Sequence, residues 1–370
     1  MKKDLSVYQL VIITVFIGLL LSFAIVYLTN TFLGDEPLTV CYDGSTFEEI
    51  DPISTFHRAV YQSEDTLTLV HEYQYRLFGI VNSRFVIAGQ NDFLFELEDT
   101  QTGYRYLEDY TGNYCFSEAE SAAILEGLQR RKATYAERGA EYILVILPNA
   151  QTVYSEYMPS YCGPISDRTR LAVLSDYLTD RGFYDFLDPT AELRAAKGDE
   201  PLYNNTENTL NALGLYYVYR TVYAHFSATV SENTAPLTRE ELNFYQHLTT
   251  GKATARRAGL AQVVKNRTVS LSNATPLNYR FVYNEWNAAT TIRLPFYIPS
   301  EVSGSPELLL QFSGTWERLQ IEPFFSNTFS QVTYQTNLLD DPLIFEAAKP
   351  KVVVQFVYEN ELSLLIDALK

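Results

Sequence analysis

The stretch "YILVILPNAQTVYSEYMP", residues 142–159, decides the fold class. Its first six residues form a continuous apolar run rich in β-branched side chains, and Pro148 ends that run. A run of this length and composition predicts a strand that is buried on both faces of a sheet. Such strands occur mainly in α/β proteins, in which helices cover both faces of a parallel sheet.

Helices and strands alternate on either side of this strand. Upstream, Ser117 and Glu120 form a capping box before a helix that reaches about Arg138 and ends at Gly139. Downstream, the pattern predicts helices at about 168–181, 211–226, 316–327 and 343–349 and at the C-terminus, and strands at 183–187, 307–312, 331–336 and 351–357. This alternation predicts a three-layer α/β/α sandwich with a mostly parallel sheet.

Two segments depart from the alternation. "RFVIAGQNDFLFELED", residues 84–99, has two short apolar runs around a Gly-Gln-Asn-Asp turn, which indicates a β-hairpin. Residues 230–305 contain β-like runs such as "TVSLSN" and "TTIRLPFYI". We therefore expect one α/β domain over residues 84–370, with an inserted β-rich subregion at about 230–305.

The N-terminal segment predicts a membrane anchor. Residues 8–28 are almost wholly apolar, and about 20 helical residues cross a bilayer core of about 30 Å. Lys2 and Lys3 favour a cytoplasmic N-terminus and an exported body. We expect a cytoplasmic stub and single-span transmembrane helix at 1–34, in the cell membrane, and a stalk and entry segment at 35–83. The alternatives are a cleaved signal peptide and a buried core helix.

Charge and cysteine content exclude some functions. The net charge of −17 and the pI near 4.7 argue against nucleic acid as a partner, because Lys and Arg supply most of that affinity. Cys41, Cys115 and Cys162 allow one disulfide and one free thiol, and their spacing fits no metal motif, so we expect no metal and no cofactor. The 28 tyrosines suit sugar surfaces or protein interfaces, or fill the core and its margins.

Residues that follow predicted strands are the first candidates for a site, because ligands of open α/β sheets bind beyond the carboxyl ends of the strands. They are Asn149, Asp188, Ser313 and Glu359, and the turn at 204–209 faces the same edge if it opens a helix. Ser313, in "QFSGTW", fits either a nucleophile in a tight turn or a helix N-cap.

A nucleophilic serine needs a base, usually a histidine, within hydrogen-bonding reach. The chain has four histidines, and none of them follows a predicted sheet strand: His57, His71, His225 and His247. Each is therefore better explained as structural or solvated.

The order and spacing of several stretches resemble a known family. These stretches are "FLFELEDTQTGYRYLEDYTGNYCFSEAE", "YILVILPNAQTVYSEYMP", "GFYDFLDPTAELRAAKGDEPLYNNTENTLNALGLYYVYRTV", "LLLQFSGTWERLQIEPFFSNTFSQVTY" and "KPKVVVQFVYENEL". Over about residues 84–365 the chain is similar to SGNH-hydrolase-like envelope proteins of the alginate O-acetyltransferase and DHHW type. The resemblance implies an α/β/α sandwich, polysaccharide O-acetylation in the bacterial envelope, and partnership with a membrane-bound O-acyltransferase or other envelope proteins.

The resemblance also implies that the catalytic motif has degenerated. The family's Thr-Asp-Thr-His-Trp-Asn falls on residues 206–211, so Glu207 replaces the Asp and Thr209 replaces the catalytic His. Of the Gly-Asp-Ser-Phe nucleophile turn only Ser313 remains, and the Lys that commonly follows the family's "LP" strand end is Ala150. The degenerate catalytic positions are Ser313, Glu207 and Thr209, and the expected binding positions are Asn149, Asn205, Asn208, Asn211 and Glu359.

Loss of the histidine sets the functional expectation. Removing the histidine of a serine triad costs roughly 10⁶ in turnover, or about 8 kcal/mol of transition-state stabilisation. We expect a catalytically impaired protein that binds a cell-envelope polysaccharide or acts as a scaffold. The alternatives are an active serine O-acyltransferase or esterase that uses Ser313 with a base such as Glu207 or a histidine of the N-terminal region, and a purely structural envelope protein.

Overall fold

The computed structural model describes residues 18, 64–81, 83–99, 102–226, 235–272, 279–283, 295–299, 306–312, 316–335 and 341–368. The chain divides into two compact units, residues 1–82 and 83–370. In the first unit, helix α3 (Glu64–Phe78) forms within the predicted stalk. Apart from residue 18, the predicted anchor at residues 8–28 lies outside the described residues, as does Cys41, and no described helix is long and apolar enough to span a bilayer.

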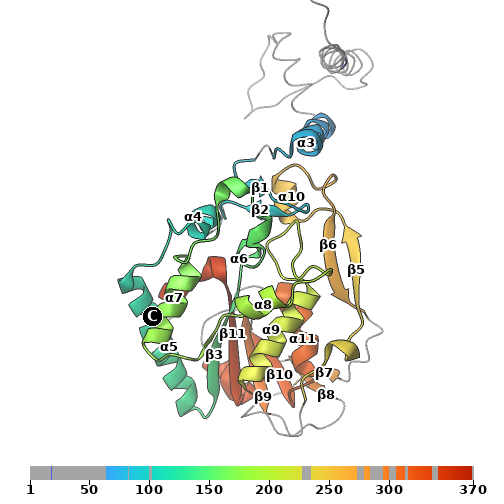
Figure 1. The fold of residues 1–370 in the computed structure, drawn as a ribbon. Coiled ribbons are helices and arrows are strands. Elements are labelled where there is room, and N and C mark those ends of the chain that lie inside the picture. The colour runs from blue at the N-terminus through green and yellow to red at the C-terminus, as the bar shows by residue number, and fades with distance from the viewer. Residues whose placement is uncertain are drawn as a thin grey trace, which may run out of the picture. The chain divides into compact units, whose positions relative to one another are not determined.

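The second unit is built on a seven-stranded sheet with the order β4-β3-β11-β9-β10-β8-β7 (Figure 1). The pairs from β4 to β10 are parallel, whereas β8 and β7 pair antiparallel at one edge. The strands are β3 (Glu141–Leu147), β4 (Phe186–Leu187), β7 (Tyr279–Tyr283), β8 (Pro295–Pro299), β9 (Glu307–Phe312), β10 (Gln331–Gln335) and β11 (Val352–Tyr358). This confirms the predicted α/β fold with a mostly parallel sheet.

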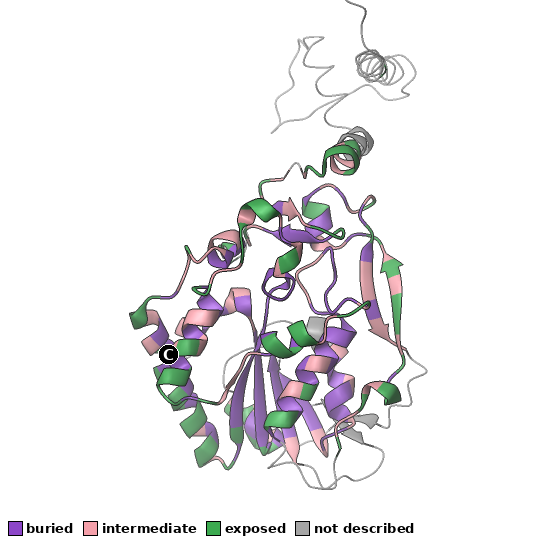
Figure 2. Ribbon diagram, in the orientation of Figure 1, coloured by how far each residue is buried: buried purple, intermediate pink, exposed green. Residues whose placement is uncertain are grey.

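Helices cover both faces of the sheet, and its central strands β3, β11, β9 and β10 are mostly buried (Figure 2). Along β3, Ile143, Val145 and Leu147 contribute to one core cluster, and Leu144 and Ile146 to the other. The first cluster includes residues of α6 (Ala150–Val153), α8 (Thr190–Ala195), α9 (Ala212–His225) and α11 (Trp316–Ser326). The second includes residues of α5 (Glu118–Glu137), α7 (Arg170–Asp180), α12 (Pro342–Ala348) and α13 (Leu364–Ala368). The continuous apolar run in β3 thus reflects burial on both sides.

The predicted hairpin and capping box are both present. β1 (Val86–Ala88) pairs antiparallel with β2 (Leu94–Glu96), and Asn91 and Asp92 between them have positive φ angles of 55° and 60°, which asparagine and aspartate tolerate in tight hairpin turns. A short helix, α4 (Tyr106–Tyr110), follows the hairpin. The side chain of Ser117 caps α5 and forms the capping box with Glu120.

The β-rich subregion expected at about 230–305 contains two separate pairs of strands. Its first half forms an antiparallel ribbon, β5 (Phe244–Thr249) with β6 (Asn266–Leu271), joined through α10 (Ala253–Arg257). Its second half supplies β7 and β8, which extend the central sheet instead of forming a separate structure. Alternating hydrophobicity identifies a strand but does not identify its partner, so the sequence could not distinguish the two arrangements.

A layer of buried glutamines crosses three neighbouring strands. The register places Gln311 of β9 beside Gln355 of β11 on one side and Gln335 of β10 on the other. The amide of Gln311 donates to the hydroxyl of Tyr135 (2.9 Å) and to the side chain of Gln335 (3.4 Å), while the hydroxyl of Tyr142 donates to Gln355. We call these three residues the glutamine ladder.

Candidate functional site

The chain connections place the site at the carboxyl ends of the central strands. From β3 the chain passes through α7 to β4 at one edge, and from β9 it passes through α11 towards the other edge. The two helices lie on opposite faces of the sheet. Ligands of open α/β sheets bind where neighbouring connections diverge in this way. The residues that follow β3 and β11 at this point are Asn149 and Glu359.

Glu359 is a fully buried acid that joins the ends of these two strands. One carboxyl oxygen accepts the backbone N–H of Asn149 at 2.6 Å, and the hydroxyl of Thr152 lies 2.9 and 2.8 Å from the two oxygens. Burial raises the pKa of Glu359 to about 8, and the negative charge of Asp109 adds to the effect, whereas the hydrogen bonds from Asn149 and Thr152 oppose it. At neutral pH the side chain is therefore mainly an uncharged acid.

A chain of hydrogen bonds leads from this strand end to the segment after the hairpin. The hydroxyl of Tyr104 donates to Asp109, and the amide of Asn149 approaches the same hydroxyl at 3.5 Å. The other carboxyl oxygen of Asp109 accepts the backbone N–H of Arg170 at 2.6 Å. Burial raises the pKa of Asp109, and the bond from Tyr104 opposes that shift. These contacts fix the orientation of the Asn149 side chain.

The turn before α9 is fastened to the same strand end through Asn208. Its side-chain oxygen accepts the backbone N–H of Ala150 at 2.6 Å, and its amide donates to the side-chain oxygen of Asn149 at 2.9 Å. A bridge between Tyr203 and Leu210 closes the turn. The structure thus brings together three of the predicted binding residues: Asn149, Asn208 and Glu359.

Glu207 and Thr209, at the degenerate catalytic positions, contact each other. The hydroxyl of Thr209 accepts from the amide of Asn204 at 2.8 Å and lies 3.4 Å from a carboxyl oxygen of Glu207. Burial raises the pKa of Glu207, and the nearby charge of Lys252 opposes the shift. A threonine hydroxyl cannot accept a proton usefully near pH 7, so this turn has a carboxyl group but no imidazole.

The other two predicted binding residues make contacts within the protein. The amide of Asn205 donates to the carbonyls of Asp92 and Lys265 at 2.8 and 3.2 Å, and its oxygen accepts the backbone N–H of Arg267. Asn211 caps α9, because its oxygen accepts from the first turn of that helix, and its amide donates to the carbonyl of Pro201 at 2.6 Å. Both side chains are fully buried and hold the turn in place. A binding role for either remains a prediction.

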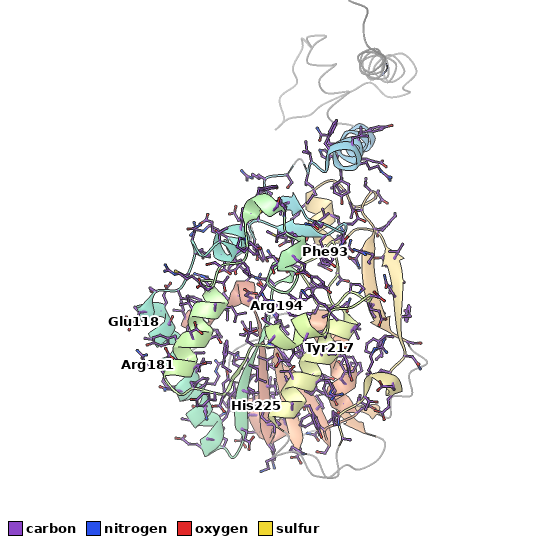
Figure 3. All side chains as sticks on the ribbon, in the orientation of Figure 1. Phe93, Glu118, Arg181, Arg194, Tyr217 and His225 are labelled. Atoms are coloured by element: carbon purple, nitrogen blue, oxygen red, sulfur yellow. The ribbon has the colours of Figure 1, made fainter. Side chains whose placement is uncertain are left out.

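The remaining candidates are separate from this cluster or outside the described residues. Ser313 and His57 lie outside them. His225 is at the last turn of the 14-residue helix α9, about 20 Å along the helix from its cap (Figure 3). His247 lies in β5 and stacks on Tyr245. In the described part of the second unit, neither histidine forms a hydrogen bond with Glu207 or Thr209.

Asp188, His71 and the cysteines have other positions. Asp188 accepts the backbone N–H of Thr190 at 3.0 Å at the start of α8, and burial raises its pKa. His71 belongs to α3 in the first unit. Cys115 and Cys162 are free thiols. Among the described residues no cluster of His, Cys, Asp and Glu could hold a metal ion.

Sequence inspection missed Tyr104, Asp109 and Thr152. Tyr104 and Asp109 follow the hairpin, not a strand of the main sheet, so the strand-end criterion did not select them. Nothing in the sequence distinguishes Tyr104 from the other tyrosines among the 28 in the chain. Thr152 lies three residues beyond Asn149, on the short helix α6 that begins at that strand end. A search for acidic residues in otherwise apolar or aromatic segments would have selected Asp109 in "YLEDY".

The raised pKa values of the buried acids predict that the free energy of unfolding falls as the pH rises. Between its unfolded pKa, about 4.3, and its folded pKa, about 8, Glu359 keeps a proton in the native state that the unfolded chain has released. Rising pH over that interval therefore favours the unfolded chain, and the raised pKa values of Glu96, Asp109 and Asp188 act in the same direction. Urea unfolding between pH 5 and 8 should show this decline, and Glu359→Gln should make it shallower. An equally steep decline in that variant would assign the effect to the other acids.

A mostly parallel sheet between two helical layers, with a polar cluster beyond its central strands, defines an open three-layer α/β protein. Residues 86–279, more than half of the chain, match the family model of the SGNH hydrolase-like domain of the acetyltransferase AlgX. The chain belongs to this family, which confirms the resemblance seen in its sequence. A comparison with curated proteins gives no match.

Solved structures share the fold at low sequence identity. Bacillus cereus PatB1 with a sulfonyl adduct is 10% identical, with a TM-score of 0.56, over 77% of this chain and 99% of that chain. A DHHW family protein from Eubacterium siraeum is 12% identical, with a TM-score of 0.50, over 68% and 90% of the two chains. The O-acetyltransferase domain of Pseudomonas putida AlgJ is 13% identical over 75% and 92% of the two chains, and its TM-score of 0.48 is too low to support a shared fold by itself.

Proposed function

We propose that this chain is a membrane-anchored, extracytoplasmic member of the family that binds a cell-envelope polysaccharide and has lost acyl-transfer catalysis. The observation that supports the loss is the environment of Thr209. Its hydroxyl is occupied by Asn204 and Glu207 at the position where the family has its catalytic histidine. The contacts by which Asn149, Asn208 and Glu359 join the turn to the ends of β3 and β11 support a site that keeps an ordered frame.

The proposed location and partners follow from the N-terminal sequence and the family. The apolar segment at 8–28, preceded by two lysines, supports a single span with the N-terminus in the cytoplasm. A protein held in this way could present a glycan to a membrane-bound O-acyltransferase or to other envelope proteins. The family description names an acetyltransferase, which supports a place in polysaccharide O-acetylation.

One observation favours a second candidate, an active enzyme in which the catalytic base is not a histidine. Burial raises the pKa of Glu207, and a carboxylate with a raised pKa is a stronger base than an exposed one. Glu207 could then activate Ser313 without a histidine. A purely structural envelope protein is the third candidate, and it would bind no glycan.

Measurements of esterase activity and of serine labelling distinguish the glycan-binding protein without catalysis from the active enzyme. Full-length protein should release acetate from p-nitrophenyl acetate no faster than its Ser313→Ala variant, because a serine without a base loses roughly six orders of magnitude in turnover. A fluorophosphonate probe should leave Ser313 unlabelled. Clear labelling that disappears in Ser313→Ala would establish the active enzyme, and a further loss of rate in Glu207→Gln would identify its base.

A further inference from the structure

Arg170, the first residue of α7, is a cation buried among aromatic rings. It is only 5% exposed, and its guanidinium carbon lies 3.8 Å from the ring centroid of Tyr114 and 4.4 Å from that of Phe116. Nε and Nη1 of Arg170 have no hydrogen-bond partner among the described residues. The rings attract the guanidinium, but burial of an isolated ion is costly, so a buried charge usually also faces an opposite charge. That charge has to come from a nearby acid.

Asp109 is the buried acid on which the charge of Arg170 acts. Its Oδ1 accepts the backbone N–H of Arg170 at 2.6 Å, and its Oδ2 accepts the hydroxyl of Tyr104 at 2.5 Å. Burial raises the pKa of Asp109, whereas these two hydrogen bonds and the positive charge of Arg170 lower it. Both oxygens of Asp109 thus act as acceptors, as they do in a carboxylate.

The direction of the hydrogen bonds beyond Tyr104 is fixed from the other end. The backbone N–H of Ala150 can only donate, so the side-chain oxygen of Asn208 faces it at 2.6 Å. The amide of Asn208 therefore donates to the oxygen of Asn149 at 2.9 Å, which leaves the amide of Asn149 facing the hydroxyl of Tyr104 at 3.5 Å. Because a donor approaches that hydroxyl, its own proton is directed to Asp109.

A backbone N–H at each end of this chain of hydrogen bonds decides the charge of Asp109. A protonated Asp109 would direct an O–H at the N–H of Arg170 or at the hydroxyl of Tyr104. In the first case two donors would meet, and in the second the proton of Tyr104 would lose its acceptor, which is costly in a buried site. All the contacts are satisfied when Asp109 is ionised, and Arg170 is then its counter-charge.

The other titratable groups around Asp109 do not supply a counter-charge. Burial raises the pKa of Tyr104 well above its usual value, so its hydroxyl stays neutral. Glu359, after β11, is mainly protonated at neutral pH and would add negative charge if it were ionised. Glu120 of α5 is within electrostatic reach of Arg170, but its carboxyl group is held in the capping box of that helix.

We propose that Arg170 is a positioning residue of the candidate site, because its positive charge keeps Asp109 ionised. The ionised Asp109 accepts the proton of Tyr104, which fixes the direction of every hydrogen bond between that hydroxyl and the turn at 204–209. Arg170 acts on the turn only through this chain of hydrogen bonds. The inference goes beyond the proposed function, since it holds whether the turn binds a glycan or takes part in catalysis.

Titration of the Asp109 carboxyl group in full-length protein tests the role of Arg170. Aspartate carboxyl groups would be labelled with ¹³C, and the Asp109 signal identified by its loss in Asp109→Asn. Arg170→Met, which keeps a long apolar side chain among the rings, should raise the proton affinity of Asp109 at least about tenfold, as expected when a nearby opposite charge is removed. Arg170→Lys should restore an affinity close to that of the wild type.

Arg181→Met is the matched control for the loss of charge. Arg181 directly follows the last residue of α7 and lies over the ring of Tyr177, 4.5 Å from its centroid, so it is also an arginine stacked on a tyrosine (Figure 3). It lies at the opposite end of the helix from the N–H that Asp109 accepts. The proton affinity of Asp109 should therefore be unchanged in this variant.

A second label follows the same event at the turn. Labelling with ¹⁵N in alanine and ¹³C in the asparagine carbonyl selects Asn–Ala pairs, of which the chain has four, at 149–150, 211–212, 273–274 and 287–288. The Ala150 amide, identified by its loss in Ala150→Gly, should titrate with the same midpoint as the Asp109 carboxyl group, and Arg170→Met should move both midpoints together. Recording these spectra in Glu359→Gln removes the separate step expected near pH 8.

Each result supports or overturns the proposal. Equal proton affinities of Asp109 in Arg170→Met and the wild type would overturn the role of Arg170, as would a lysine variant that behaves like the methionine variant. A shift in Arg181→Met as large as that in Arg170→Met would assign the effect to net charge and also overturn it. If Arg170→Met does not fold, the wild-type titration still decides, because an Ala150 signal that stays constant while Asp109 titrates contradicts the chain of hydrogen bonds.

Discussion

Glu359→Ala is expected to lower the free energy of unfolding by about 3 kcal/mol at pH 7, whereas Glu359→Gln leaves it nearly unchanged. The alanine variant removes the acceptor of the Asn149 N–H and the partner of the Thr152 hydroxyl, and each buried polar group left unpaired costs about 1–3 kcal/mol. Glutamine has the shape of the uncharged acid, keeps one acceptor oxygen and can donate to Thr152. Urea unfolding followed by fluorescence would measure the free energy of unfolding of both variants.

The comparison between the two variants tests the protonation state. Glutamine imitates Glu359 only if that acid is neutral in the native protein, as its pKa of about 8 implies. A glutamine variant as unstable as the alanine variant at pH 7 would show that the native side chain is ionised. The same measurement at pH 9 is the control, because there the wild type must bury a charge that glutamine lacks.

Gly214→Ala is expected to destabilise the protein by about 3 kcal/mol or to prevent folding, although alanine is the better helix former by about 1 kcal/mol. Gly214 lies in the first turn of α9, close to the segment that precedes the helix. A Cβ atom there would be 2.3 Å from the carbonyl oxygen of Leu202 and 2.6 Å from Cδ2 of Leu210. The first contact is with backbone, so a side-chain rotation cannot relieve it.

Gly198→Ala is the matched control, because no atom lies within 4 Å of the Cβ that it would introduce. We expect its unfolding free energy to stay within about 0.5 kcal/mol of the wild type. Thermal and urea unfolding would compare the three proteins. If Gly214→Ala were as stable as Gly198→Ala, the close approach of α9 to Leu202 would be wrong.

Much of the fold could be predicted from the sequence because its central strands are buried on both faces. Residues 142–147, 307–312 and 352–357 are nearly uninterrupted apolar runs. The helices at 118–137 and 212–225 have caps at Ser117 and Asn211. The partners of β7 and β8 could not be predicted, because any antiparallel edge strand has the same alternating pattern. Helix α3 was missed because its polar and apolar residues resemble those of a linker.

The site was predictable only where it depends on topology. Asn149 and Glu359 were found because residues after parallel strands gather at one edge of the sheet. The contribution of Tyr104 and Asp109 depends on how the segment after the hairpin folds back onto that edge, which no local pattern encodes. The family resemblance supplied the correspondence of Glu207 and Thr209, and the structure adds that their side chains lie 3.4 Å apart.

The glutamine ladder has a consequence for how the chain avoids misfolded pairings. In β9 and β11 the apolar residues are almost continuous, so a shift of two residues along a strand would still leave hydrophobic side chains on both faces. The same shift would place a buried amide of Gln311 or Gln355 beside an aliphatic side chain with no hydrogen-bonding group. Since an unpaired buried amide costs about 1–3 kcal/mol, such a loss disfavours the shifted alignment. The ladder therefore selects the native alignment of β9, β10 and β11 by penalising its competitors, an effect that a measurement of native stability alone would not reveal.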